Sequence, residues 1–205
     1  METTTTGRRP RVAGEREGDI LDATVSVLCE VGYDRLTMDQ VAALAKASKA
    51  TLYRRWDSKA ELVIDAVVRA KQMPAPELAD TGSLRGDLMT AACGQSGWAE
   101  EISMSALAGL LTAVNADPQL FRLWQERFLL PRMEWNRAVF ERAIARGEIA
   151  DDVNLDLLST LIPSMCMFRA MVLGQPVDAA FVTAVIDGLL IPAVGPDPSS
   201  DRPCS

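Results

Sequence analysis

The sequence predicts an all-α protein of about nine helices, with a small three-helix unit near the amino end and a larger helical domain after it. Apolar residues recur at spacings of three and four along most of the 205 residues, which is the pattern of helices that bury one face. Glycine and proline separate the segments, and two prolines and a glycine mark a linker at residues 72–82. Helix-start signals recur as well: Thr37 with Gln40, Ser58 with Glu61, and Asp117 before Pro118.

The composition is that of a globular protein whose two parts differ in charge. Hydrophobic residues make up 48% and charged residues 24% of the chain, and the net charge is −7, which excludes a disordered or fibrous protein. Residues 1–73 hold 12 Lys/Arg and 11 Asp/Glu, a balance of +1, whereas residues 74–205 hold 9 and 17, a balance of −8. Nucleic-acid phosphates repel the acidic part, so only the first part is suited to contact them.

Several classes of chemistry are excluded by what the chain lacks. It has no histidine, and its four cysteines (Cys29, Cys93, Cys166 and Cys204) are far apart and show no metal-ligand spacing. Histidine-based metal sites and Ser-His-Asp catalysis are therefore excluded. Phosphate-binding loops and paired carboxylates in an apolar setting are also missing, so an enzyme or carrier is the weakest hypothesis. We expect buried reduced thiols, no catalytic residue, no metal and no cofactor.

The chain shows no pattern typical of secretion or membrane insertion. Its amino end lacks the apolar core of a secretory leader. The most apolar run, residues 157–173, includes two serines, a threonine, a proline and Arg169, which favours a buried helix over a membrane span. We expect a cytoplasmic protein with no membrane partner.

The amino end begins with a polar segment and continues into a helix. Residues 1–14 carry Arg8, Arg9 and Arg11, and two interpretations stay open: a flexible tail, or a basic arm that follows phosphates or enters the minor groove. Residues 15–31 predict the first helix, which Gly32 is placed to end in a left-handed cap. Its apolar stripe consists of Ile20, Leu21, Val25, Leu28 and Cys29.

Residues 37–56 predict two short helices joined by a tight turn. Thr37 and Gln40 form a capping box for the first helix, and Ser48 is a natural cap for the second, residues 49–55. Leu52 is expected to be buried, which leaves these side chains outward: Lys49, Thr51, Tyr53 and Arg54. Cations, a hydroxyl and a phenol suit phosphates and base edges. An exposed basic second helix is the arrangement that enters the major groove of DNA.

A small apolar core is expected to hold this second helix in place, and another helix follows it. The expected core residues are Leu21, Val25, Leu28, Val41, Ala45, Leu52 and Trp56. Ser58 and Glu61 form a second capping box, which predicts a helix to about Lys71. Lys59 in its first turn is either a surface charge or a phosphate ligand, and its closeness to Tyr53 in sequence favours the second interpretation.

The segment GYDRLTMDQVAALAKASKATLYRRWDSKAELV resembles the DNA-binding segment of the TetR family of one-component bacterial repressors. The resemblance covers roughly residues 20–71 and includes the Gly32-Tyr33 step, the helix start at Thr37, the run from Ser48 to Tyr53, the aromatic residue at 56 and Lys59 after a serine. It implies phosphate contacts for Thr37, Tyr53 and Lys59. It also implies that Ser48, Lys49 and Thr51 lie at or in the groove; Lys46 and Arg54 complete the expected DNA-binding set.

The segment departs from the family pattern at three places. Lys46 occupies a position where the family often has glycine, so the turn must form without it, or Lys46 adds a phosphate contact. Ala50 replaces a frequent glycine, which narrows the approach to the bases. Arg55-Trp56 replaces the usual His-Phe pair, which leaves the contact of Arg55 unassigned.

After a linker, residues 73–194 predict a second helical domain. The expected helices are residues 83–96, 100–114, 118–147 with an interruption at Pro131, 154–173, and 178–191 with a stop at Pro192. The Arg146-Gly147-Glu148-Ile149 loop is similar to the turn that often precedes the last two helices in TetR-type proteins. Both last helices are apolar on more than one face and need cover on several sides. The resemblance implies that residues 154–191 form a four-helix homodimer interface; residues 195–205 are expected to be a flexible tail.

Aromatic and methionine side chains of the middle helices are candidates for a small-molecule site: Trp98, Met104, Leu107, Leu111, Phe121, Trp124, Phe128, Met165 and Phe168. The alternative is a filled core, which such stripes more often form. Methionine-rich linings adapt to varied ligands, and the resemblance implies a largely apolar cavity. Candidates to orient a ligand are Gln95, Asn115, Asn136 and Arg169. The excess of acidic residues in this part of the chain favours a cationic or neutral ligand over an anionic one. The alternative is that these residues only form a solvated surface.

These observations predict a sequence-specific DNA-binding transcriptional regulator. The expected protein is a repressor that binds a pseudo-palindromic operator as a dimer, with half-sites about 34 Å apart or more. A small, largely apolar effector of unknown identity would release it by favouring a different separation of the two DNA-binding units. The alternative is a helix-turn-helix regulator or activator without a small-molecule effector.

Overall fold

The computed structural model of the chain describes residues 13–71, 80–94 and 102–194. The described part is helical throughout and contains no strand, which confirms the predicted fold class. The basic arm up to residue 12, Gln95, Trp98 and the tail of residues 195–205 lie outside the described residues. We call residues 13–71 the head and the described residues from 80 to 194 the body.

Four helices form the head at one end of the molecule: α1 (Ala13–Arg35), α2 (Met38–Leu44), α3 (Lys49–Tyr53) and α4 (Lys59–Ala70). The α1 range contains two helical pieces that meet at Gly32, so the first piece ends at the predicted residue. Gly32 has φ 76° and ψ 168°, a conformation that glycine adopts without steric cost. It therefore kinks α1, and one further turn follows to Arg35.

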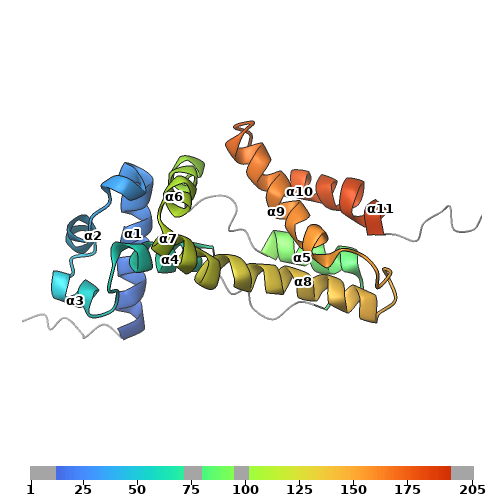
Figure 1. Cartoon of the computed structure of the whole chain (residues 1–205), viewed down its shortest axis with the longest axis horizontal. Helices are drawn as coiled ribbons and strands as arrows, with labels where there is room; N and C mark the ends of the chain where they lie inside the picture. The colour runs from blue at the N-terminus through green and yellow to red at the C-terminus, as the bar shows by residue number, and fades with distance from the viewer. Residues whose placement is uncertain (1–12, 72–79, 95–101, 195–205) are drawn as a thin grey trace, which may run out of the picture.

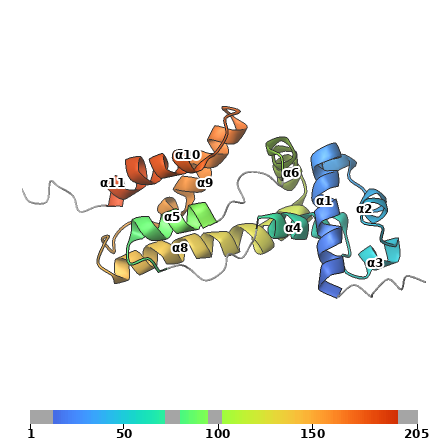
Figure 2. The ribbon, with the colours of Figure 1, turned by 180° about the vertical axis from the view of Figure 1, so that it is seen from behind.

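The body extends away from the head (Figure 1). Its helices are α5 (Leu84–Gly94), α6 (Met104–Ala116), α7 (Pro118–Trp124), α8 (Leu130–Ala145), α9 (Leu155–Met171), α10 (Ala179–Val185) and α11 (Ile191–Val194). The views from both sides place α6 against α1, while α5 and α9–α11 lie at the far end along α8 (Figure 2).

Two prolines predicted to break helices lie inside continuous ones. A π-helical turn at Gln125–Leu129 joins α7 to α8 across Pro131, and another at Ile186–Leu190 joins α10 to α11 across Pro192. Each wide turn ends two residues before the proline. Proline clashes with the carbonyl four residues earlier in a regular helix, and a widened turn relieves that contact. If α7 with α8 and α10 with α11 are each counted as one helix, the described residues form nine helices, the number that was predicted.

The apolar interior consists of two clusters. The first, which we call the head core, includes every predicted core residue, from Leu21 to Trp56, and none of these is more than 9% exposed. Ile102, Leu110 and Leu120 of the body extend the same cluster, so α6 and α7 are built onto the head. The second, the distal core, joins α5, α8, α9 and the α10–α11 helix.

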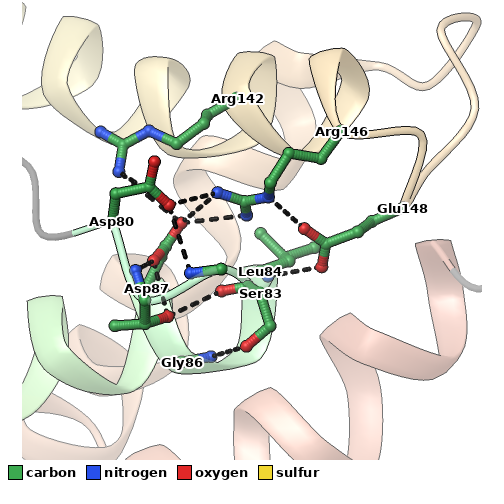
Figure 3. Close-up of polar contacts among 10 residues, drawn as sticks. Asp80, Ser83, Leu84, Gly86, Asp87, Arg142, Arg146 and Glu148 are labelled. Carbon is green, nitrogen blue, oxygen red and sulfur yellow. Dashed lines mark hydrogen bonds and ion pairs between the residues drawn. The ribbon is translucent and has the colours of Figure 1, made fainter.

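An ionic cluster around the buried Asp87 attaches α5 to the end of α8 (Figure 3). Asp87 accepts hydrogen bonds from the Thr81 backbone N–H at 2.7 Å and from Arg146 at 3.0 Å. Glu148, placed by Gly147 at φ 72°, accepts the Leu84 N–H at 2.6 Å. Burial alone would raise the pKa of Asp87, but the hydrogen bonds from Thr81 and Arg146 leave it below its ordinary value. The Arg-Gly-Glu turn therefore fixes the start of α5.

Candidate nucleic-acid interface

Local capping places the two short helices of the head. The predicted box at α2 is present: the Gln40 N–H donates to the Thr37 hydroxyl at 3.3 Å, and the Thr37 N–H donates to the Gln40 side chain at 2.8 Å. At α3, the Thr51 N–H donates to the Ser48 hydroxyl at 3.1 Å. Both caps act within three residues and satisfy free N–H groups at a helix start.

The turn between α2 and α3 forms without the glycine that the family often has there. Lys46 adopts φ 51°, and the Ala47 and Lys46 N–H groups donate back to Ala42 and Ala43 at 2.9 and 3.2 Å. This is a Schellman-type helix end with lysine in its left-handed position. That conformation costs a residue with a β-carbon about 1–2 kcal/mol. Arg16 donates to the Lys46 carbonyl and supports the turn.

The α3 helix presents a polar face to solvent and buries the opposite side. Leu52 is fully buried, whereas Lys49, Tyr53 and Arg54 are exposed, Tyr53 to 52%. The hydroxyls of Ser48 and Thr51 lie 2.8 Å apart at the start of this face. Lys49 forms an ion pair with Asp39 of α2 at 2.6 Å, and this pair raises the pKa of Lys49 above its ordinary value.

Lys59 is anchored within the head itself. Its ammonium group donates to the Tyr33 carbonyl at 3.0 Å and lies 4.3 Å from the centre of the Tyr33 ring, an arrangement in which the ring attracts the cation. Burial of the ring is the main reason that the pKa of Tyr33 is raised to about 12, and the negative charges of Asp117 and Asp34 add to it. Lys59 thus joins the start of α4 to the end of α1, a contact that the sequence pattern did not predict.

Contacts between distant residues secure the end of α3. Arg55, unassigned from the sequence, pairs with Glu17 of α1 at 2.8 Å. The buried Trp56 indole donates to Asp65 of α4 at 2.8 Å, and Arg127 of the π-helical turn donates to the other oxygen of Asp65 at 2.9 Å. One carboxylate therefore connects the recognition segment to the body. No local pattern could have indicated this link, because Asp65 and Arg127 are 62 residues apart.

The predicted ligand-site residues are separated into three groups. Leu107, Leu111 and Phe128 are partly buried against the head core, and Phe128 lies with its ring centre 4.3 Å from that of the buried Trp124. Phe121 and Phe168 are exposed, to 42% and 52%. Met165 is partly buried on α9; Trp98 and the side chain of Met104 lie outside the described residues.

The exposed face of the last two helices is unusually apolar. Between residues 154 and 191, six large hydrophobic side chains are at least 40% exposed: Leu157, Met167, Phe168, Val172, Leu173 and Leu189. Five of them belong to α9 or the two residues after it. No described helix is long and apolar enough to cross a bilayer. This many exposed large hydrophobic side chains on neighbouring helices is typical of contact with another protein chain.

The helix-turn-helix head with an exposed basic second helix defines a DNA-binding regulator. The chain matches the bacterial regulatory proteins of the tetR family at residues 20–66 and the tetracyclin repressor-like C-terminal domain at residues 78–189. It belongs to the TetR family of transcriptional regulators.

Relatives of known sequence match along most of the chain. An uncharacterized HTH-type transcriptional regulator of Mycobacterium tuberculosis is 37% identical over 183 residues, 87% of this chain and 88% of its own. The DNA-binding transcriptional repressor TetR of Mycobacteroides abscessus is 34% identical over 181 residues, 88% of this chain and 95% of its own.

Solved structures show the same fold. The TetR family transcription regulator SCO0332 is 27% identical with a TM-score of 0.61 and covers 89% of this chain and all of its own. A transcriptional regulator from Saccharomonospora viridis, crystallised in complex with choline, has a TM-score of 0.63 at 15% identity and covers 89% of this chain and 99% of its own.

Proposed function

We propose that this TetR-family regulator is a repressor that binds a pseudo-palindromic operator as a homodimer and dissociates when a small-molecule effector binds. The observation that carries the proposal is the solvent-exposed polar face of α3, held by a fully buried Leu52 on the opposite side. Residues 15–72 would form the DNA-binding domain, and residues 73–194 the ligand-binding and dimerisation domain. Because its target is chromosomal DNA, the protein would act in the cytoplasm.

The proposed DNA contacts follow from the chemistry of that face. Thr37, Tyr53, Arg54 and Lys59 would contact phosphates, with Lys46 at the turn, and Ser48, Lys49 and Thr51 would lie at the groove. Lys49 must leave Asp39 to reach DNA. Both side chains of that pair are about 60% exposed, and such surface pairs contribute only about 0.2–1 kcal/mol, so an acceptor on the DNA can displace the carboxylate at little cost.

Dimerisation through residues 154–191 is supported by the exposed apolar face of α9. Two copies related by a twofold axis would bury Leu157, Phe168 and Val172, which are 65%, 52% and 65% exposed in one chain. The same axis would place two α3 helices for adjacent half-sites of an operator. The pairing thereby determines the separation at which both heads reach DNA.

Release by an effector is supported by the way the head is joined to the body. Since α6 and α7 share the head core and Arg127 holds Asp65, a ligand that shifts these helices also shifts α4 and the recognition segment. The relative from M. abscessus is named a DNA-binding transcriptional repressor, which supports repression by this chain.

Binding to the DNA that flanks its own gene tests the proposal, with fluorescence anisotropy as the readout. We expect tight, salt-dependent binding in which Lys49→Ala changes sequence preference and reduces the salt slope by about 1. Tyr53→Phe should weaken binding to all sequences. Arg137→Ala is the matched control, since it removes an exposed, carboxylate-paired cation from α8 of the body. Equal effects of Lys49→Ala and Arg137→Ala would refute the assignment of α3 as the reading helix.

A further inference from the structure

The segment that contains the two short helices of the head carries a single carboxylate. Between Thr37 and Trp56, Asp39 is the only acidic residue of the sequence, whereas four cations occur there: Lys46, Lys49, Arg54 and Arg55. Asp39 belongs to the first turn of α2 and is exposed. DNA repels a carboxylate that approaches its phosphates. Asp39 therefore lowers the affinity of this surface for DNA unless the DNA supplies a hydrogen-bond donor.

Asp39 lies beside the start of the recognition helix. Its carboxylate is 2.6 Å from the ammonium group of Lys49, the first residue of α3, and the two side chains are about 60% exposed. Residues at the start of a recognition helix are the ones that contact base edges in helix-turn-helix proteins. An exposed donor and an exposed acceptor thus lie side by side where bases would be contacted.

The alternative is that Asp39 only stabilises α2. A negative charge in the first turn of a helix interacts favourably with the helix dipole. The cap itself does not need Asp39, since Thr37 and Gln40 form the capping box of this helix. A role confined to α2 makes the same contribution whatever DNA sequence is bound, and this separates it from base recognition in an experiment.

A G·C base pair presents the complementary groups in the major groove. Guanine offers the acceptors N7 and O6, and cytosine offers its N4 amino group as a donor. Guanine O6 and cytosine N4 are hydrogen-bonded to each other in the base pair, so they are about 2.9 Å apart. This spacing is close to the 2.6 Å between the Lys49 ammonium group and the Asp39 carboxylate. One base pair can therefore receive both side chains, because the first is a donor and the second an acceptor.

An A·T base pair fits these two side chains less well. Its amino group, adenine N6, lies between two acceptors, adenine N7 and thymine O4, and the thymine methyl group adjoins O4. A carboxylate at N6 would be close to both acceptors, whereas cytosine N4 has an acceptor on one side only. Lys49 would meet a single acceptor at thymine O4 in place of two at guanine. Phosphates offer Asp39 no donor at all.

We propose that Lys49 and Asp39 read one G·C base pair in each half-site of the operator, with Lys49 donating to guanine N7 and O6 and Asp39 accepting from cytosine N4. The ion pair of the free head is thereby exchanged for contacts with one base pair. This inference rests on the proposed function and names the base pair that the start of α3 selects. On any other sequence Asp39 stays near the phosphates without this donor, which makes it a specificity-determining residue.

Selection from a library of DNA duplexes tests the inference on the full-length protein. The duplexes carry about 30 randomised base pairs, close to three helical turns, and binding to the enriched sequence is then measured by fluorescence anisotropy. We expect a G·C pair at the equivalent position of both half-sites. Replacing it with A·T, T·A or C·G should weaken binding about tenfold or more. Replacing the guanine with 7-deazaguanine, which lacks the N7 acceptor, should weaken binding as well.

Two variants and a matched control assign the contacts. Lys49→Ala should abolish the preference for guanine at that position. Asp39→Asn should reduce the discrimination there about fivefold or more and shift it from cytosine towards adenine, because asparagine pairs with adenine N6 and N7. Its affinity for DNA of random sequence should rise, since a negative charge is removed. The control is Asp22→Asn, which removes an exposed carboxylate of α1 that pairs with Arg69 of α4 at 3.2 Å; every base preference should stay unchanged.

The inference is overturned if Asp39→Asn selects the same bases as Asp22→Asn at every position, or if no selected G·C pair loses its preference in Lys49→Ala. A change of affinity that is equal for all duplexes would assign Asp39 to the stability of α2 and would overturn it too. Failure of the proposed function looks different, because the unmodified protein would then enrich no sequence. A palindromic sequence that Asp39→Asn selects unchanged would retain the DNA-binding function and remove only this inference.

Discussion

Replacing Arg127 with methionine should loosen the connection between the DNA-binding head and the body. The guanidinium donates to Asp65 at 2.9 Å and to Glu61 at 3.2 Å, both on α4. The second oxygen of Asp65 accepts the indole N–H of Trp56 at 2.8 Å, directly after the recognition helix. Methionine retains the apolar stem that packs at the π-helical turn but removes both ion pairs.

The magnitude follows from how exposed these groups are. The side chains of Arg127, Asp65 and Glu61 are 38%, 34% and 23% exposed, so each pair should contribute no more than about 0.2–1 kcal/mol. The variant also leaves the two carboxylates four residues apart on α4 without a cation, which costs a few tenths of a kcal/mol more. We expect a loss of about 1–2 kcal/mol, or roughly 2–8 °C in Tm for a chain of this size.

Two assays test this link, and a matched variant controls for charge. Urea unfolding of Arg127→Met, Asp65→Asn and the double variant should give a coupling free energy of about 0.5–1 kcal/mol between the two residues. Anisotropy should show that an effector changes the DNA dissociation constant about fivefold less in Arg127→Met than in the unmodified protein. Arg137→Met removes ion pairs to Glu141 and Asp156, neither of which belongs to the head.

The reasoning is refuted if the coupling free energy is zero, or if Arg127→Met and Arg137→Met change the effector response equally. In the first case Asp65 and Arg127 would be neighbours without energetic interaction. In the second the response would not travel through α4. An unchanged Tm would contradict the expected loss of at least about 1 kcal/mol, because it would show that both ion pairs are weak.

Four further predictions concern single side chains. Lys46→Gly should stabilise the protein by about 0.5–1 kcal/mol in urea unfolding, since it removes the left-handed strain at φ 51°; no gain would contradict the strain. Cys166 should resist iodoacetamide at pH 8 in the native protein and react in urea, as measured by peptide mass spectrometry, because it is buried and its pKa is raised to about 11. Phe168→Glu should give monomers in light scattering, whereas Leu130→Glu, on α8 and 47% exposed, should not. The pKa of Asp87 is lower in the folded than in the unfolded protein. The ionised carboxylate therefore stabilises the fold at pH above the unfolded pKa, and this stabilisation is lost as the pH falls through the folded pKa. Asp87→Asn should lower the free energy of unfolding at neutral pH and make its decline in acid shallower, as measured by urea unfolding across pH.

The parts of the fold that depend on near neighbours were predictable from the sequence. The caps at Thr37 and Ser48 need a partner only three residues away, and both formed as expected. The lysine in the turn between them also adopted the conformation that glycine would have taken. The predicted breaks at Pro131 and Pro192 were wrong. Proline removes a hydrogen bond and clashes inside a regular helix, but here a π-helical turn before each proline keeps the helix continuous, so that its apolar face stays packed.

The parts that depend on tertiary neighbours were not predictable. Helical spacing shows which face of a helix is apolar, but it does not show what covers that face. Phe121 and Trp124 belong to the same stripe, yet Trp124 is 7% exposed and Phe121 42%. Likewise, the sequence does not show which carboxylate an arginine pairs with. Arg137 pairs with Glu141, four residues away, whereas Arg127 of the body pairs with Asp65 of the head.

The same distinction applies to the choice of ligand. A balance of −8 over residues 74–205 describes charges that are mostly on the surface, where salt screens them beyond about 8–10 Å. A ligand that enters the body leaves that field and meets only the groups within contact distance. Composition therefore predicts which part of the protein avoids DNA, but it does not predict which ligand the body binds.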